Sequence, residues 1–296
     1  MPPTLSGQSK PALAALILGG MVIGASPVFV RLSEVGAVPT AFWRLALALV
    51  PLFFLARRPG AGGEAKPRGL RQIWLVSLPG LILGTELMAW HISLHMTSVA
   101  NSTLLVNMAP VFVALYSWLI LRRPPGRLFL FALVLTLLGV VVLKGGPAAL
   151  GDGHLAGDAV AIFAAALYAA YLVILTRVRE TFAASVIMLW STAAAALAVL
   201  PFALADGGAL LPWTLAGWLV LFGLSWLSQA GGQSLIAWAL AWLPATFSSL
   251  TLLLQPVVAA LLAWAVLGEA LTPWQAVGGV IVLAGIWTAR LAQKRG

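Results

Sequence analysis

The sequence predicts an all-α integral membrane protein with ten transmembrane helices, arranged as two inverted five-helix repeats with both termini in the cytoplasm. Composition is the first reason: 61% of the residues are hydrophobic and 8% are charged, whereas soluble domains average about 45–50% apolar and about 25% charged residues. The second reason is a series of apolar runs of about 20 residues, the length that crosses a bilayer. The third is a repeat of the pattern after 146 residues, the spacing of Pro110 and Pro256.

Ten apolar runs follow one another along the chain between short polar breaks. They cover residues 12–32, 38–56, 72–95, 98–121, 127–144, 155–177, 183–205, 213–239, 245–267 and 273–290. The first run has the position of a signal peptide, but a second run follows at once and no clear small-residue cleavage site separates them. We therefore expect the first run to be a transmembrane helix.

The basic residues predict the orientation of these helices. With the N-terminus inside, the outer segments contain only Arg31 and Lys144 of the 17 Lys and Arg residues, and Arg44 lies within a span. The cytoplasmic segments contain Lys10, Arg57, Arg58, Lys66, Arg68, Arg71, Arg122, Arg123, Arg127, Arg177, Arg179, Arg290, Lys294 and Arg295. Cytoplasmic loops carry the Lys and Arg excess, so both termini are expected in the cytoplasm. Because the charges alternate between loops and do not gather on one face, the net charge of +9 does not indicate nucleic-acid binding.

The repeat divides the chain into residues 1–150 and 151–296, with Pro110 and Pro256 at equivalent positions. Because each repeat has an odd number of expected spans, the second must enter the bilayer upside down. Inverted repeats are typical of secondary transporters, whose substrate site lies near the midplane between the halves. A duplicated scaffold without a transport role, such as a membrane enzyme, is the alternative.

Prolines in the middle of spans are candidates for gating. Pro110 and Pro256 each remove a backbone donor, which permits a kink. Ser26 and Pro27 break the first span at a depth similar to that of Arg44. We interpret the two repeat prolines as paired hinges and the Ser26–Pro27 pair as part of an outer gate; static bends are the alternative.

Ionisable residues inside a bilayer are costly and mark functional sites. Arg44 in the second span and Glu86 in the third differ by about 5 Å in expected depth at about 1.5 Å of rise per residue, so an ion pair is predicted. Glu86 is also a candidate proton carrier or contact for a substrate ammonium group; a purely structural pair is the alternative. His91 and His95 share a helix face, but no third ligand is convincingly placed, so no metal is expected. His91 is instead a candidate lining residue of a cavity.

Uncharged polar side chains form a second candidate set. Ser225, Gln229 and Gln233 are spaced four apart, which places them on one face of the eighth span. Asn101 lies in the fourth span and Gln255 in the ninth. Amides in a bilayer need partners, so these residues either join helices by hydrogen bonds or line a wet cavity that accepts an amphipathic zwitterion.

Three aromatic residues are candidates for contact with an aromatic substrate. Trp90 lies in the third span, and Tyr168 and Tyr171 lie in the sixth. Aromatic rings stack on aromatic ligands, while packing within the helix bundle is the alternative.

Two longer stretches resemble a known family. They are 86-ELMAWHISLHMTSVANSTLLVNMAP-110 and 229-QAGGQSLIAWALAWLPATFSSLTLLLQP-256. Together with the repeated block of Pro, Trp and Leu, they resemble the drug/metabolite transporter superfamily of the EamA type, and within it the YddG-type aromatic amino-acid exporters. The resemblance implies a multi-pass exporter of the bacterial inner membrane, which alternates access around a cavity lined by spans 1, 3, 4, 6, 8 and 9.

The energy source follows in part from what the sequence lacks. No G-x-x-x-x-G-K-[ST] loop and no soluble domain are present to bind ATP, no cofactor is expected, and the absence of cysteine excludes thiolate metal sites. An ion gradient or the substrate gradient would then drive export, with proton coupling through Glu86 as a hypothesis. Small metabolites, above all amino acids, are the predicted substrates. Alternatives are efflux of drugs or other metabolites by the same fold, a membrane-embedded enzyme, and a channel.

Overall fold

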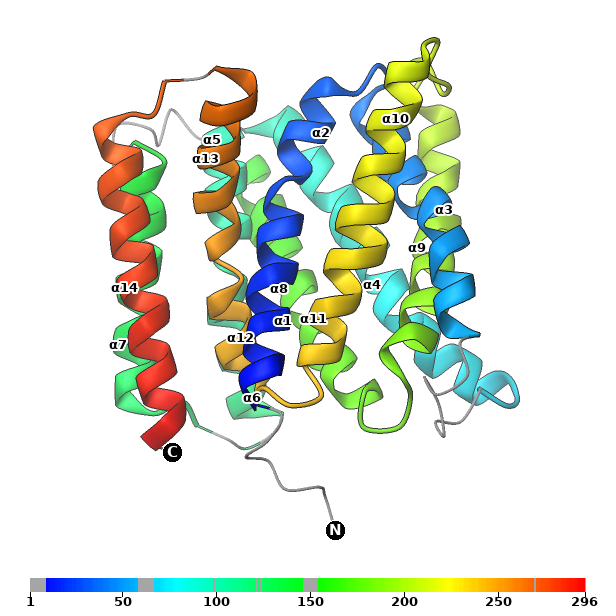
Figure 1. The fold of residues 1–296 in the computed structure, drawn as a ribbon. Helices are drawn as coiled ribbons and strands as arrows, with labels where there is room; N and C mark the ends of the chain where they lie inside the picture. The colour runs from blue at the N-terminus through cyan, green and yellow to red at the C-terminus, as the bar shows by residue number, and fades with distance from the viewer. Residues whose placement is uncertain are drawn as a thin grey trace. The chain divides into compact units, whose positions relative to one another are not determined.

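The computed structural model describes residues 9–57, 67–97, 99–120, 122, 124–145, 154–268 and 270–295, and its regular elements there are all helices (Figure 1). The chain forms two compact units. Unit 1 comprises Met1–Met88 and Ile174–Leu243, and unit 2 comprises Ala89–Val173 and Pro244–Gly296. Each unit therefore combines segments from both halves of the sequence.

Unit 1 contains most of the elements that position the candidate site. Its helices are α1 (Ser9–Gly24), α2 (Ser26–Leu32), α3 (Ala37–Ala56), most of α4 (Leu70–Met96), α9 (Ala184–Ala205), α10 (Leu215–Gly223), the π-helix η2 (Leu224–Gly232) and α11 (Gln233–Ala239). Unit 2 contains α5 (Val99–Val106), α6 (Ala109–Leu119), α7 (Arg127–Leu143), most of α8 (Leu155–Val178), α12 (Ala245–Thr251), α13 (Leu254–Leu267) and α14 (Pro273–Arg295).

Eight helical segments in the described residues are long and apolar enough to cross a membrane. The fifth predicted span forms the shorter apolar helix α7, and the eighth is divided among α10, η2 and α11. The protein is thus an all-helical multi-pass membrane protein. The number ten and the orientation of the termini stay predictions.

Three of the predicted spans are interrupted beside a proline. Helix α1 ends at Gly24, one residue separates it from α2, and Pro27 lies in the first turn of α2. Likewise, α5 ends before Pro110, which lies in the first turn of α6, and α12 ends before Pro256 in α13. Proline has no backbone N–H and fits the first turn of a helix, where that donor has no partner. The interruptions therefore occur where the sequence predicts breaks and kinks.

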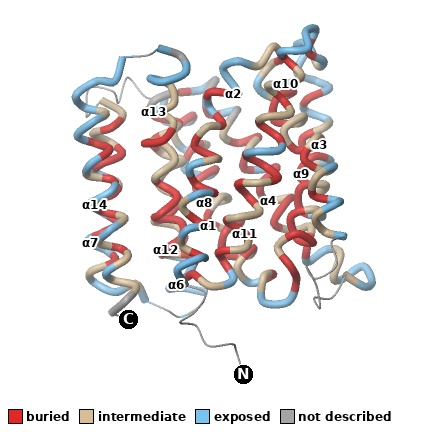
Figure 2. The backbone as a smooth tube through the Cα atoms, viewed as in Figure 1, coloured by how far each residue is buried: buried red, intermediate tan, exposed pale blue. Residues whose placement is uncertain are grey.

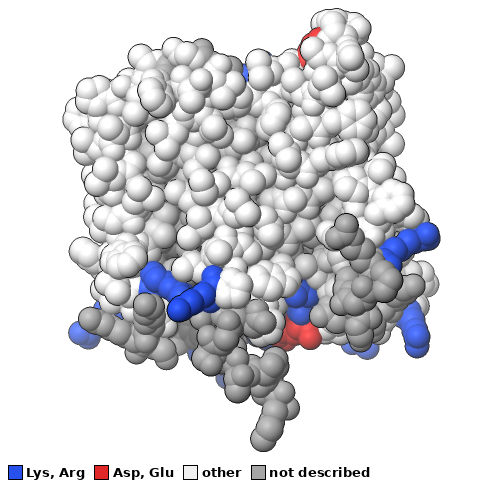
Figure 3. All heavy atoms as spheres, viewed as in Figure 1, with Lys and Arg blue, Asp and Glu red and all other residues white. Residues whose placement is uncertain are grey.

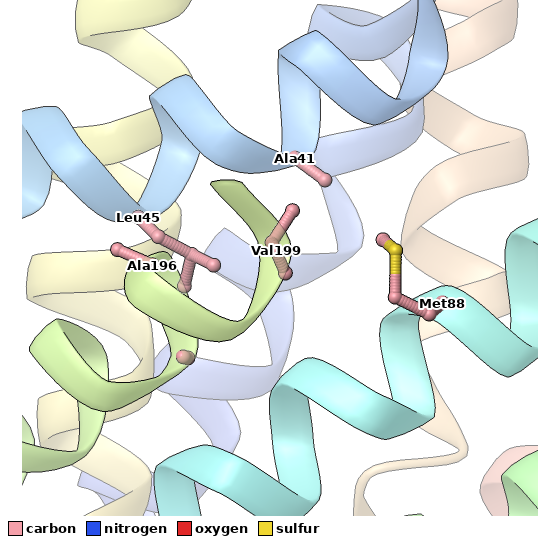
Figure 4. Close-up of a cluster of buried hydrophobic side chains, with 6 residues drawn as sticks. Ala41, Leu45, Met88, Ala196 and Val199 are labelled. Carbon is pink, nitrogen blue, oxygen red and sulfur yellow. The ribbon is translucent and has the colours of Figure 1, made fainter. Parts of the chain in front are cut away.

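Helices α3 and α9 pack closely against each other in unit 1. The apolar cluster between them contains Ala41, Leu45, Met88, Ala195, Ala196 and Val199 (Figure 4). Small side chains let the backbones approach, as is common between membrane helices. Buried and exposed residues alternate along both helices (Figure 2), and exposed positions of α9 such as Leu197 and Phe202 are apolar. These outer faces are suited to lipid.

Helices α7 and α14 form the corresponding close pair in unit 2. A Cβ atom added at Gly139 would lie 2.6 Å from the backbone nitrogen of Val282, and one added at Gly278 would overlap the backbone of Leu143. Only glycine allows this approach at both positions.

Charged side chains lie at the ends of the helices on the face shown in Figure 3, and the surface between them is uncharged. Lys10 lies in the first turn of α1, Arg57 directly after α3, and Arg127 at the start of α7. The predicted cytoplasmic residues Arg58, Lys66 and Arg123 lie outside the described residues, as do the side chains of Lys294 and Arg295. A band of apolar surface between charged ends is typical of a membrane protein.

Candidate functional site

A buried polar cluster in unit 1 connects α3, η2 and α9. The Nε atom of Arg44 donates a hydrogen bond to Oε1 of Gln229 at 3.2 Å. The Nε2 atom of Gln229 donates in turn to the hydroxyl of Thr192 at 3.3 Å. Gln229 and Thr192 are each 1% exposed, and Arg44 is half-buried. The three side chains form a continuous chain of hydrogen bonds within the helix bundle of unit 1.

Glu86 on α4 is the acidic residue of this cluster. Its side chain is 5% exposed, and the positive charge of Arg44 acts on it. A buried carboxyl group requires a partner of this kind because desolvation of an isolated charge is costly. The sequence predicts an ion pair between these residues. The positive charge of Arg44 acts on the Glu86 carboxyl group, and Gln229 accepts a hydrogen bond from the same guanidinium group. The ion pair itself stays a prediction.

The π-helix η2 directs two polar side chains toward α3. The Ser225 hydroxyl lies 2.9 Å from the carbonyl oxygen of Trp43 and 2.6 Å from that of Arg44, and donates to them. Gln229, one turn later, binds the Arg44 side chain. The predicted shared face of Ser225 and Gln229 therefore points at one helix. Short π-helical segments occur frequently at functional sites.

A proline in α3 supplies a further contact with η2. Pro51 has no N–H to donate to the carbonyl oxygen of Leu47 four residues earlier, as an ordinary helical residue would. The indole Nε1 of Trp226 donates to this carbonyl oxygen at 3.2 Å. The freed carbonyl and the indole thus add a further contact between η2 and α3.

The cluster has the chemistry to bind a zwitterion. The Arg44 guanidinium group presents several planar donors, which suit a carboxylate. The Gln229 amide is both donor and acceptor, and the Glu86 carboxylate suits an ammonium group or a proton. Among the described residues, no group of three or more His, Asp or Glu side chains is placed to hold a metal ion.

The remaining polar candidates are placed in both units. Gln233, at the start of α11 in unit 1, is buried. Asn101 in unit 2 is buried, and Gln255 is half-buried. Near Asn101, the hydroxyl groups of Ser93 and Ser102 share a 2.6 Å hydrogen bond between α4 and α5.

The aromatic candidates lie in unit 2 and include one fully buried ring. Tyr171 is 0% exposed and stacks on Tyr168 with 5.9 Å between the ring centres. Trp90 is half-buried. The stacked pair stabilises packing in α8, which is the alternative role that the sequence leaves open. The side chains of His91 and His95 lie outside the described residues.

The proposed gating residues differ in environment. Ser26 is buried, and its hydroxyl has no hydrogen-bond partner among the described residues, while the neighbouring Pro27 is exposed. Pro110 is buried and Pro256 half-buried. All four residues lie beside helix interruptions, as described above, which makes them suitable positions for bending.

Sequence reasoning missed two polar residues of unit 1. Thr192 completes the hydrogen-bond chain from Arg44, and Ser228 donates to the carbonyl oxygen of Val22 in α1 at 3.1 Å. A single hydroxyl in an apolar run carries little signal, because it can bond to its own helix backbone. The sequence feature that could have identified Ser228 is its position next to Gln229.

The sequence pattern of the EamA-like transporter family matches residues 10–144 and, a second time, residues 155–291. The protein belongs to the EamA-like transporter family. It is therefore a membrane transporter of the type that this family and the solute carrier 35 proteins share.

The relatives of this EamA-like protein support the same conclusion. Two Archaeoglobus fulgidus proteins described as uncharacterized transporters are 28% and 25% identical to it, over 96% and 93% of this chain and 97% and 95% of their own. Human solute carrier family 35 member G1 is 26% identical over 56% of this chain and 47% of its own. A solved crystal structure with 16% identity has a TM-score of 0.79 over 96% of this chain and 98% of its own, which shows a shared fold.

Proposed function

We propose that this EamA-like protein is a secondary-active exporter of small metabolites, and that its substrates are amino acids with aromatic or other neutral side chains. The single observation that carries the proposal is the buried chain of Arg44, Gln229 and Thr192 beside Glu86. A carboxylate and an ammonium group on one small molecule match the guanidinium and carboxyl groups of this cluster. A YddG-type preference for aromatic amino acids is the specific form of the proposal.

The transport cycle would follow from inverted repeats. The family pattern matches twice, over residues 10–144 and 155–291, which supports two five-helix repeats. The basic residues of the loops support cytoplasmic termini, and a bacterial inner membrane is the proposed location. Two inverted halves offer two equivalent ways to open, so alternating access is the expected mechanism. The interruptions before Pro110 and Pro256 are the proposed bending points.

Within the cluster, each residue has a proposed role. Arg44 would bind the substrate carboxylate, and Gln229 would hold the guanidinium group in place through its hydrogen bond. Glu86 would contact the substrate ammonium group or carry a proton during the cycle. Gln233 and the polar and aromatic candidates of unit 2 stay proposed substrate contacts.

Counterflow in proteoliposomes tests this function. Purified protein is reconstituted into vesicles loaded with one unlabelled compound, and uptake of the same labelled compound is measured for tryptophan, phenylalanine, threonine, a sugar phosphate and a cationic dye. The proposal expects accumulation of the amino acids, with the aromatic ones fastest. Uptake of the dye alone would replace it with drug efflux. No uptake of any compound by demonstrably folded protein would reject transport of this panel altogether.

A further inference from the structure

An apolar groove of about 490 Å³ lies on unit 1 between the second half of α3 and η2. Its walls include Val50 and Phe54 from α3 and Trp226 from η2, which are 51%, 66% and 48% exposed. Large exposed apolar side chains here border a hollow in the surface. In a membrane protein, lipid is the solvent that such a surface meets.

Small residues and one hydrogen bond shape the groove. Ala230 and Gly231 form part of its lining, and a methyl group at Ala230 and no side chain at Gly231 leave the hollow open. A Cβ atom added at Gly231 would have one neighbour within 4 Å, the carbonyl oxygen of Trp226 at 3.3 Å. The Trp226 ring is held in place because its Nε1 atom donates to the carbonyl oxygen of Leu47. The hydrogen bond restrains this one ring, which lowers the entropic cost of binding beside it.

A positive charge lies at the end of α3 beyond the groove. Val50, Phe54 and Arg57 are spaced at i, i+4 and i+7, which places them on one helix face. The Arg57 guanidinium carbon lies 3.9 Å from the centre of the Phe53 ring, and that ring is 5.8 Å from the Phe54 ring that lines the groove. Arg57 is exposed, and no acidic residue lines the groove. The surface thus combines an apolar channel with one basic end.

We propose that this groove binds one acyl chain of an anionic phospholipid, whose phosphate is held by Arg57. The apolar walls match a hydrocarbon chain, and a basic residue at the membrane surface attracts anionic headgroups. The groove adjoins η2 directly after Gln229, so a bound chain would lie against the π-helix of the polar cluster. Binding itself does not depend on the identity of the transported substrate.

Native mass spectrometry tests the lipid site directly. Purified protein in detergent is titrated with phosphatidylglycerol and with phosphatidylcholine of the same chain length, and the bound fraction is measured. Arg57→Gln removes the charge, and Arg127→Gln is its matched control on α7. Gly231→Leu and Val50→Trp fill the groove, and Leu219→Trp, on the exposed face of α10, is their control.

The proposal expects one tightly bound phosphatidylglycerol, favoured over phosphatidylcholine by about fivefold. Arg57→Gln should remove this preference, while Arg127→Gln keeps it. Both groove-filling variants should weaken binding of both lipids severalfold, and Leu219→Trp should not. Equal retention of the two lipids by the wild-type protein would overturn the proposal that Arg57 holds the phosphate. Equal effects of Val50→Trp and Leu219→Trp would overturn the proposal that the groove binds the acyl chain.

Discussion

Trp226 donates a hydrogen bond from its indole Nε1 to the carbonyl oxygen of Leu47 at 3.2 Å. This carbonyl lacks its usual helical donor because residue 51 is proline. The carbonyl oxygen of α3 that lacks a donor thereby receives a hydrogen bond from a side chain of η2, which is distant in the sequence. The contact also fixes the π-helix that carries Gln229.

The first prediction concerns this contact. Trp226→Phe keeps an aromatic ring but removes the donor, and we expect it to destabilise the protein by about 1 kcal/mol. In a Pro51→Ala background, the restored N–H satisfies Leu47, so the same change should cost less than half as much. Reversible unfolding of all four proteins in mixed micelles measures the coupling. An equal penalty in both backgrounds would contradict the assignment.

The second prediction concerns two glycines of α4 that face α9. A Cβ atom added at Gly80 would overlap the Ser191 carbonyl group, whereas one added at Gly84 would lie 3.2 Å from Cβ of Ala198. We expect Gly80→Ala to cost about 3 kcal/mol through overpacking. Gly84→Ala should cost less than about 1 kcal/mol, because the higher helix propensity of alanine offsets the contact. Similar melting temperatures for the two variants in detergent would show that the helices are not this close.

The third prediction concerns pH. The Glu34 carboxylate accepts a hydrogen bond from the Thr214 hydroxyl and, at 3.1 Å each, from the backbone N–H groups of Thr214 and Trp213. These bonds, the hydroxyl first, lower the pKa of Glu34 below its ordinary value. Its stabilising contribution is therefore present above the unfolded-state pKa of about 4.3 and is lost as the pH falls through the folded-state pKa.

Glu34→Gln should accordingly lower the melting temperature at pH 7, and the difference from wild type should shrink as the pH falls from 5 to 3. Thr214→Val removes the hydroxyl donor to Glu34 and also the bond that this hydroxyl accepts from the Gly217 N–H at the start of α10, so only part of its effect should shrink as the pH falls. Melting curves at a series of pH values measure this. A difference between wild type and Glu34→Gln that stays constant over the whole range would argue against a stabilising role of these hydrogen bonds.

The fourth prediction concerns proton coupling. If Glu86 carries protons, Glu86→Gln should abolish the dependence of transport on a pH gradient and leave substrate exchange intact, because glutamine cannot release a proton. Glu180→Gln is the control, since Glu180 pairs with Arg177 at 3.3 Å at an exposed helix end. Uptake into vesicles with and without an imposed pH gradient separates the two cases. Unchanged gradient dependence in Glu86→Gln would limit this residue to a structural role.

Much of the fold can be predicted from local patterns. Apolar runs of bilayer length place most helices, because backbone groups in lipid must bond within their own helix. The interruptions beside Pro27, Pro110 and Pro256 are also predictable, since the missing N–H is a property of the residue itself. The division of the chain into unit 1 and unit 2 is not predictable in this way, because long-range packing determines which segments of the two halves associate.

Part of the candidate site was also predictable from the sequence. Arg44, Glu86 and Gln229 are conspicuous in apolar runs because polar groups in lipid need partners. Thr192 is inconspicuous, and its role depends on a contact 37 residues away in sequence. The π-helix is not predictable from the sequence either. Its wider turns leave no periodic pattern in the sequence, and contacts with α3 stabilise it.

The most direct test of the central claim is counterflow of an amino acid by Gln229→Leu, compared with wild type and with the control Gln293→Leu, which lies near the end of α14. Loss of the hydrogen bond to Arg44 leaves the guanidinium group without its orienting partner amide, so we expect the apparent KM of Gln229→Leu to rise at least tenfold. The control should match wild type. Wild-type KM and rate in folded Gln229→Leu would contradict a substrate site at this cluster.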